Sequence, residues 1–354
     1  MKVAIVYSEI LIERPDIQDT IEEIAFVIEA IGKLGYEHNL FPVNLVNPLS
    51  GFENELEAFV NSIKTYKPAV IFNLIEEIDT SEHVYSLIMR SFKEIDIPYT
   101  GSSFGVIHNT TNKVVAKNIL QKSNIPTPHW NVWSEGNTNL HINNLSKELF
   151  PEKPFQEKLF QEKLLWMVKP VWEDGSVGIG DFSVLPSNTL QTLTVGQTKR
   201  LFDGRPTFFE QYIDGREFNV SLLEHIDGYV EILPVSEIVF NDWPTDKPKI
   251  VDYKAKWESN SFEYANTPRV FDCTEPFIPV MKDIALTCWQ VFNLNGYARV
   301  DMRVDSRGNM YVLEINTNPC IGYESGFIAS CARAGYGTAD IINRIINVAL
   351  KRYF

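Results

Sequence analysis

The sequence predicts an α/β region followed by α+β lobes: a small doubly wound parallel sheet, then antiparallel sheets. Three observations predict this class. Strand-like and helix-like apolar patterns alternate over the first hundred residues. Later strands are mixed with helices without strict alternation, which is typical of α+β lobes. The chain has 354 residues, long enough for two or three domains.

The first hundred residues predict the order β-α-β-α-β, which implies a parallel sheet. The first helix has a capping box at Thr20 and Glu23 and a stop at Gly35. Residues 69–74 are almost all apolar, as in a strand covered on both faces. The expected elements are strand KVAIVY, helix DTIEEIAFVIEAIGKLG, strand HNLFPV, a helix marked by Leu56, Phe59, Val60 and Ile63, strand AVIFNL and a helix near 81–94.

The pattern changes after residue 100. Helical NKVVAKNILQKSN ends at IPTP, and residues 134–163 are polar and irregular, which we interpret as an insertion of a loop and a helix. The expected strands are then LLWMVKP, DFSVL, PTFFEQYI, EFNVSLLE, VEILPVSEIVF, YARVDMRV and MYVLEINT, with helices near 187–197, near 276–292 and over TADIINRIINVALKRY.

These patterns predict three domains. The first spans 1–103, the second spans 104–205 with the 134–163 insertion, and the third spans 206–354. A Gly-free charged stretch at about 244–268 is expected to be a long loop that acts as a lid.

Composition narrows the classes of function. The formal charge of −14 and pI near 5.0 argue against a nucleic-acid or anionic-membrane binder. The four cysteines have no CxxC spacing, which favours a reducing cytoplasm. The N-terminus reads as a strand instead of a signal peptide, and no apolar run approaches the ~20 residues of a membrane span. We expect a cytoplasmic protein.

A predicted hairpin places polar groups in a core strand. Arg299 and Asp301 share one face of YARVDMRV, and Glu314 and Asn316 share one face of MYVLEINT. If the two faces coincide, three oxygen donors converge, which suits Mg²⁺ together with substrate phosphates. The alternative is an ion-pair ladder of Arg299, Asp301 and Glu314 at a solvated sheet face. The hairpin by itself favours neither.

A second cluster lies in LLWMVKPVWEDGSVGIG. Lys169 ends an apolar strand, and the Gly-rich loop that follows lets backbone N–H groups approach a phosphate. The alternative is a plain hairpin turn with Lys169 on the surface.

Other charged positions are ambiguous alone. Glu210 and Glu217 flank an Asp-Gly turn, where they suit either adenosine recognition or a solvated hairpin. Lys113 lies in the first turn of a helix, where a cation is unfavourable unless an anion is near. Lys117 lies one turn further, so the alternative is a solvated helix face. Lys256 is expected on the lid.

Taken in order, these clusters resemble the ATP-grasp superfamily, and within it the D-alanine–D-alanine ligase group. The segments VKPVWEDGSVGIG and ARVDMRVDSRGNMYVLEINTNP carry the resemblance. It implies a ligase that joins a carboxylate to an amine through an acyl phosphate, with ATP between two lobes. The implied roles are ATP phosphates at Lys113, Lys169, Gly175 and Ser176; adenine at Glu210, Tyr212 and Ile213; ribose at Glu217; two Mg²⁺, or Mn²⁺, at Asp301, Glu314 and Asn316; and catalysis by Lys256, Arg299 and Ser325, the last on the carboxylate of the amine substrate.

Several positions depart from the group. The Gly-rich loop whose glutamate holds the first substrate is replaced by YSEILIERPD, where Glu9 or Glu13 would substitute. Gly175 stands for a serine, Trp257 for a tyrosine and Cys320 for a glycine. We therefore expect an amino-acid acceptor and an acyl donor other than D-alanine.

Three rival interpretations stay open: a true D-alanine–D-alanine ligase, a catalytically silent ATP-binding protein, and an enzyme whose phosphoryl transfer stops at a phosphorylated product. The expected partners are small carboxylate and amino-acid substrates, with no nucleic acid or membrane. The resemblance also implies a possible homodimer.

Overall fold

The computed structural model describes residues 1–8, 17–43, 52–75, 82–133, 164–173 and 175–353. Its N-terminal sheet is parallel, with strand order β2-β1-β3. This sheet confirms the doubly wound region that the sequence predicts. The strands are β1 (Lys2–Ser8), β2 (Glu37–Val43) and β3 (Val70–Asn73).

Helices cover both faces of this sheet, because successive β1 side chains point to opposite sides. Val3 and Ile5 share one core with residues of α1 and the closing helix α14. Ala4 and Val6 share another core with residues of α2 and α3. The helices are α1 (Ile17–Lys33), α2 (Phe52–Tyr66), α3 (Glu82–Ile95) and α14 (Thr338–Tyr353).

The predicted capping box of α1 is wrong. The helix already includes Ile17, so Thr20 lies inside it. The Glu23 carboxylate is only 2% exposed and accepts a hydrogen bond from the Ile321 backbone N–H, with Oε1 and N 2.7 Å apart. A tertiary contact from far along the chain therefore uses the group that local spacing assigned to a cap. Gly35, at φ +68°, follows the end of the helix as predicted.

The second sheet is antiparallel, with order β4-β7-β5-β6. The segment DFSVL is only partly a strand, because Asp181–Ser183 forms a 3-10 turn. The predicted insertion at 134–163 lies outside the described residues. The elements of this region are α4 (Phe104–Thr111), α5 (Lys113–Lys122), β4 (Trp130–Val132), β5 (Leu165–Pro170), β6 (Val184–Pro186), α8 (Ser187–Thr192), α9 (Val195–Leu201) and β7 (Thr207–Gln211).

The largest sheet has the order β11-β10-β8-β12-β13, and β9 also pairs with β8. Helix α12 packs its apolar side chains on this sheet. The segment VEILPVSEIVF forms two strands separated at Pro234, which cannot donate to a strand ladder. The elements are β8 (Gly215–Glu224), β9 (Val230–Ile232), β10 (Ser236–Ile238), β11 (Arg269–Val270), α12 (Ile278–Phe292), β12 (Tyr297–Asp305) and β13 (Met310–Thr317).

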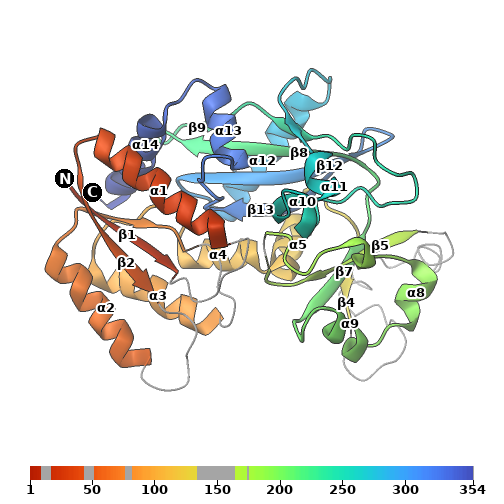
Figure 1. Ribbon diagram of the computed structural model, residues 1–354, viewed down its shortest axis with the longest axis horizontal. Coiled ribbons are helices and arrows are strands. Elements are labelled where there is room, and N and C mark those ends of the chain that lie inside the picture. The colour runs from red at the N-terminus through yellow and green to blue at the C-terminus, as the bar shows by residue number, and fades with distance from the viewer. Residues whose placement is uncertain (9–16, 44–51, 76–81, 134–163, 174, 354) are drawn as a thin grey trace.

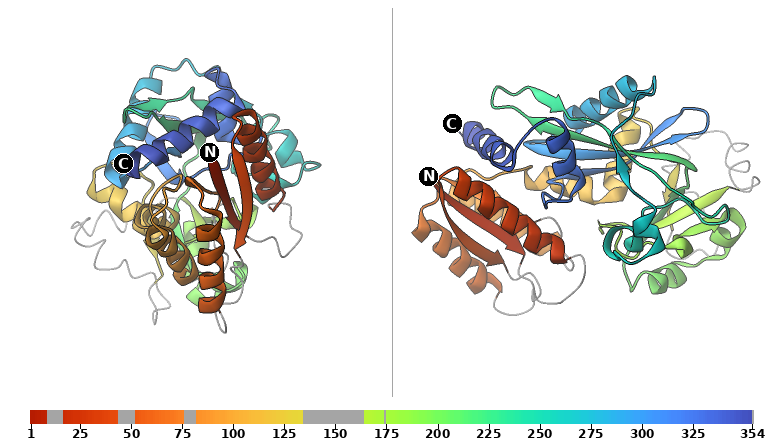
Figure 2. Two further views of the ribbon diagram at one scale, coloured as in Figure 1. Left: turned by 90° about the vertical axis from the view of Figure 1, so that its left-hand side faces the viewer. Right: turned by 45° about the horizontal axis from the view of Figure 1, so that its top comes forward.

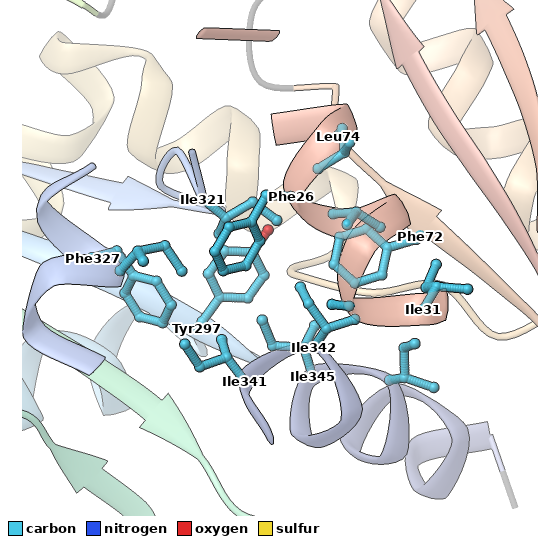
Figure 3. Packing of buried hydrophobic residues seen from close by; sticks show 14 of the residues in the cluster. Phe26, Ile31, Phe72, Leu74, Tyr297, Ile321, Phe327, Ile341, Ile342 and Ile345 are labelled. Carbon is cyan, nitrogen blue, oxygen red and sulfur yellow. The ribbon is translucent and has the colours of Figure 1, made fainter. Parts of the chain in front are cut away.

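One apolar core joins the N-terminal sheet to the largest sheet. Phe26 of α1 and Phe72 of β3 lie close to Tyr297 of β12 and Ile321, as Figure 3 shows. Phe327, from α13 (Gly326–Arg333), completes this cluster. The chain that follows β13 is therefore held against the N-terminal region.

None of the helices in the described ranges has both the length and the apolar character required to cross a bilayer.

Candidate active site

A cavity of about 950 Å³ lies where the second and largest sheets meet. Figures 1 and 2 show α10 (Tyr253–Trp257) and α11 (Phe262–Ala265) between these sheets. The cavity brings together all the predicted site residues that the structure describes. They are Lys113, Lys169, Gly175, Ser176, Glu210, Tyr212, Ile213, Glu217, Lys256, Trp257, Arg299, Asp301, Glu314, Asn316, Cys320 and Ser325. Glu9 and Glu13 lie outside the described residues.

The β12–β13 pairing places the predicted oxygen donors side by side. Asp301 is opposite Glu314, and Arg299 is opposite Asn316. Asp301 is 5% exposed and accepts two bonds from Arg299, at 2.7 Å from Nε and 2.8 Å from Nη2. The Asn316 amide nitrogen lies 3.0 Å from Asp301 Oδ2. The ion pair between Arg299 and Asp301 therefore exists. It lies in the buried wall of the cavity, so the alternative of a solvated sheet face is wrong.

Positive charge surrounds Glu314. Burial alone would raise the pKa of this carboxyl, but the Lys113, Lys256 and Lys169 ammonium groups and Arg299 outweigh burial and hold its pKa well below the usual range. The lysines come from α5, α10 and β5, so only the tertiary structure gathers them. Such an excess of cations in a cavity suits a ligand that carries several negative charges.

The donor set fits a divalent cation that phosphate oxygens help to coordinate. Asp301, Glu314 and Asn316 offer hard oxygen donors, and Mg²⁺ is usually bound by one or two carboxylates plus phosphates. Over the described ranges, no three His, Cys, Asp or Glu side chains gather into a closed metal site.

A buried ion triad supports the floor of the cavity. Glu210 of β7 is 2% exposed, with its two oxygens 2.7 Å from Lys117 Nζ and 2.7 Å from Lys169 Nζ. Lys117 also donates to Thr127 Oγ1 at 2.8 Å and to the Val312 carbonyl at 3.2 Å. The alternatives of a solvated helix face for Lys117 and a surface position for Lys169 are therefore wrong. Sequence spacing did not show that Glu210 pairs with both lysines.

Arg303 organises the part of the cavity predicted to face adenosine. Its guanidinium lies 2.8 Å from Glu217 Oε2 and donates to the Ile213 carbonyl at 2.7 Å. Tyr212 Oη accepts a bond from the Lys249 backbone N–H at 2.8 Å. Arg303 therefore holds Glu217 in place; this arginine is 3% exposed and lies directly across the β8–β12 ladder from Glu217.

The lid stretch contains a helix where a loop was expected. Lys256 lies on α10, which Asp252 caps through a 2.9 Å bond from the Ala255 N–H to Oδ1. The signal was present in the sequence, since Asp is a preferred N-cap residue. Ser176 Oγ donates to the Val251 carbonyl at 2.7 Å, so the Gly/Ser loop and the lid are in contact.

Comparison with known proteins identifies the family. A family model described as D-ala D-ala ligase C-terminus matches residues 119–347. The chain belongs to the D-ala D-ala ligase family. Members are ATP-grasp ligases, so this protein is an enzyme that forms a C–N bond at the expense of ATP.

The individual relatives include both an uncharacterised protein and D-alanine–D-alanine ligases. An uncharacterised protein, y4sG of Sinorhizobium fredii, is 28% identical over 287 residues, which cover 80% of this chain and 76% of the relative. A D-alanine–D-alanine ligase of Carboxydothermus hydrogenoformans is 28% identical, covering 73% of this chain and 74% of its own length.

Among solved structures, a D-alanine–D-alanine ligase of Bacillus anthracis complexed with ATP superposes with a TM-score of 0.69 at 19% identity. The match covers 100% of this chain and 98% of that one. This similarity confirms the predicted ATP-grasp fold.

Two departures from the D-alanine–D-alanine ligase group contact each other. Trp257 Nε1 donates to the Gly175 carbonyl at 2.8 Å. Gly175 has φ +63°, a left-handed conformation that glycine adopts without strain. A Cβ on Gly175 would stand 3.6 Å from Trp257 Cζ2. The Trp257 side chain and the Gly175 backbone are therefore in direct contact, and a substitution at either position affects the other.

The cavity residues that sequence reasoning missed include Glu22, Asn219, Arg269 and Arg303. Asn219 Nδ2 donates to Asp301 Oδ1 at 2.7 Å, and its position opposite Asp301 on β8 follows from strand pairing. Glu22 reaches the cavity from α1, where a Cβ on Gly322 would lie 3.8 Å from its Oε2. No local pattern distinguishes Glu22 from other helix-surface acids.

Proposed function

We propose that this enzyme ligates a carboxylate other than D-alanine to the amino group of an amino acid. The observation that carries the proposal is the bond between Trp257 and Gly175. By resemblance to the D-alanine–D-alanine ligases, these positions belong to the donor pocket. The indole makes its wall larger and more apolar than a tyrosine would.

The reaction would take place in two steps. An oxygen of the donor carboxylate attacks the γ-phosphorus of ATP, the bond to the bridging oxygen breaks, and ADP leaves. The acceptor amine then attacks the acyl carbon, loses a proton and expels phosphate. Lys113, Lys169 and Lys256 would hold the phosphates, and Arg299 would stabilise the oxyanion of the second step. Ser325 would hold the acceptor carboxylate.

Asp301, Glu314 and Asn316 would hold two Mg²⁺ ions, or Mn²⁺ in their place. The ions would neutralise phosphate charge, which lowers the repulsion that an anionic nucleophile meets. The cationic surroundings of Glu314 support this assignment, because they suit a polyanionic ligand.

Glu22 would replace Glu9 or Glu13 as the carboxylate near the donor. It lies on α1 next to Gly322, in the segment that carries Cys320. A carboxylate at this place would favour a donor with a cationic group.

A phosphate-release screen tests the proposal. The enzyme would be mixed with Mg·ATP and pairs of D- and L-amino acids, and mass spectrometry would identify the products. We expect no turnover with D-alanine alone, and turnover with another donor plus an amino acid. Efficient formation of the D-alanine dipeptide would favour the rival D-alanine–D-alanine ligase. ATP binding without ADP formation in any mixture would favour the silent ATP-binding protein.

A further inference from the structure

The cavity contains a guanidinium for which the proposed reaction gives no role. Arg269 lies on the edge strand β11 and lines the cavity. Its Nη1 donates to the Glu324 carbonyl at 3.2 Å. Its Nε is buried and has no hydrogen-bond partner among the described residues. A buried donor without a hydrogen-bond partner destabilises the protein, because the free energy of its desolvation is not compensated. We expect an atom of a bound ligand to accept this hydrogen bond.

The other two guanidinium groups of the cavity are already neutralised. Arg299 binds both oxygens of Asp301, and Arg303 binds Glu217. Arg269 forms no ion pair within 4 Å in the part of the chain that the structure describes. Arg269 is therefore the cavity arginine best able to accept an anionic ligand.

The surroundings of Arg269 add positive potential. Nη2 lies 3.3 Å from the point where a Cβ on Gly326 would stand, so the guanidinium packs against the first residue of α13. A helix N-terminus carries partial positive charge and disfavours a cation. Burial and then Arg299 lower the pKa of Arg269, while the charges of Asp301 and Glu324 and the Tyr264 phenol act against this shift. A bound anion would offset the unfavourable effects of burial, of Arg299 and of the helix N-terminus on the Arg269 cation.

Ser325 lies at the same place. It is the N-cap of α13, and its Oγ accepts a bond from the Ile328 N–H at 3.3 Å. Its hydroxyl can also donate one hydrogen bond. Ser325 and Arg269 thus both lie at the first turn of α13.

We propose that Arg269 binds the α-carboxylate of the acceptor amino acid, together with Ser325. The assignment rests on the proposed function, and it divides the work between two arginines. Arg299, which is held by Asp301, acts at the reacting carbonyl, while Arg269 selects acceptors that carry a carboxylate. A guanidinium suits this role because its planar N–H groups match the two oxygens of a carboxylate.

Direct binding tests this assignment without any turnover. Calorimetry with ADP and Mg²⁺ present would compare alanine, serine, aspartate and lysine, in both configurations, with their carboxamides. We expect the wild type to prefer the amino acid, and Arg269→Met to weaken its binding by about 10- to 100-fold, the range for hydrogen bonds to a charged group. The variant should bind carboxamide and amino acid equally, and Arg269→Lys should fall between.

Arg216→Met is the matched control. Arg216 lies on β8 and pairs with Glu237 and Glu275, outside the cavity, so its loss should leave the preference unchanged. A carboxylate preference that survives in Arg269→Met would overturn the assignment. An effect confined to aspartate, or a wild type that binds none of these amino acids, would overturn it as well. Carboxylate preference without phosphate release in any mixture would refute the proposed ligation but leave the role of Arg269 intact.

Discussion

The two ends of the cavity are built in different ways. The lysine end is defined by Lys113, Lys169, Glu210 and Glu314. The last three lie on sheet strands, and Lys169 and Glu210 also form a buried ion pair. At the lid end, defined by Gly175, Trp257, Arg269 and Cys320, the side chains come from loops, a short helix and a two-residue edge strand. Rigid strands suit chemistry shared by a family, and loops suit differences in substrate.

The largest expected effect concerns the stability of the lysine end. Glu210→Gln leaves the Lys117 and Lys169 ammonium groups near each other without an anion. The free energy of unfolding should therefore fall by about 3–5 kcal/mol. Denaturant midpoints at an unchanged slope would measure it. Lys117→Met is the matched comparison and should cost less, because the Lys169–Glu210 pair survives. Equal losses would show that the triad is not what stabilises this end.

The same substitution has a defined pH dependence. Burial would raise the pKa of Glu210, but Lys117 and Lys169 outweigh burial and lower it below the ordinary value. A carboxyl with a lowered pKa stabilises the fold above its unfolded pKa of about 4.3 and loses this contribution as pH falls through the folded value. The stability gap between wild type and Glu210→Gln should therefore be complete at neutral pH and shrink in acid.

The next effect concerns chemistry at the lysine end. Glu314→Gln keeps the shape but removes the charge that faces three lysines, so kcat should fall by about 10²–10³, as for the loss of one group aimed at the transition state. Phosphate release against Mg²⁺ concentration would measure it, and half-saturation should move to higher Mg²⁺. An unchanged Mg²⁺ dependence would remove Glu314 from the metal set.

The smallest effect concerns the lid end. Trp257→Phe deletes the 2.8 Å bond to the Gly175 carbonyl, and the donor KM should rise by about 2- to 12-fold, the equivalent of 0.5–1.5 kcal/mol, with kcat little changed. Trp243→Phe is the matched control, because its indole also bonds a lid carbonyl, that of Pro248 at 3.2 Å, but does not line the cavity. If only the KM for ATP changed, Trp257 would contribute to ATP binding and not to donor binding, which would contradict this assignment.

The sequence alone determined the class and order of the main elements, and it singled out the charged residues of the lysine end as candidates. Apolar periodicity located β1, α1, β3 and the β12–β13 hairpin, because these signals are local. Asp301, Glu314 and Asn316 could be paired because a two-residue repeat fixes the face of each strand. Family resemblance then joined these segments into one site.

The tertiary structure alone decided which distant groups meet. Glu23 accepts a bond from the Ile321 backbone, Lys117 is buried against Glu210, and Arg269 packs on Gly326. Each contact joins residues more than 50 positions apart, so no local pattern predicts it. Sequence periodicity states which face a side chain occupies, whereas burial and charge pairing depend on what the rest of the chain places opposite that face.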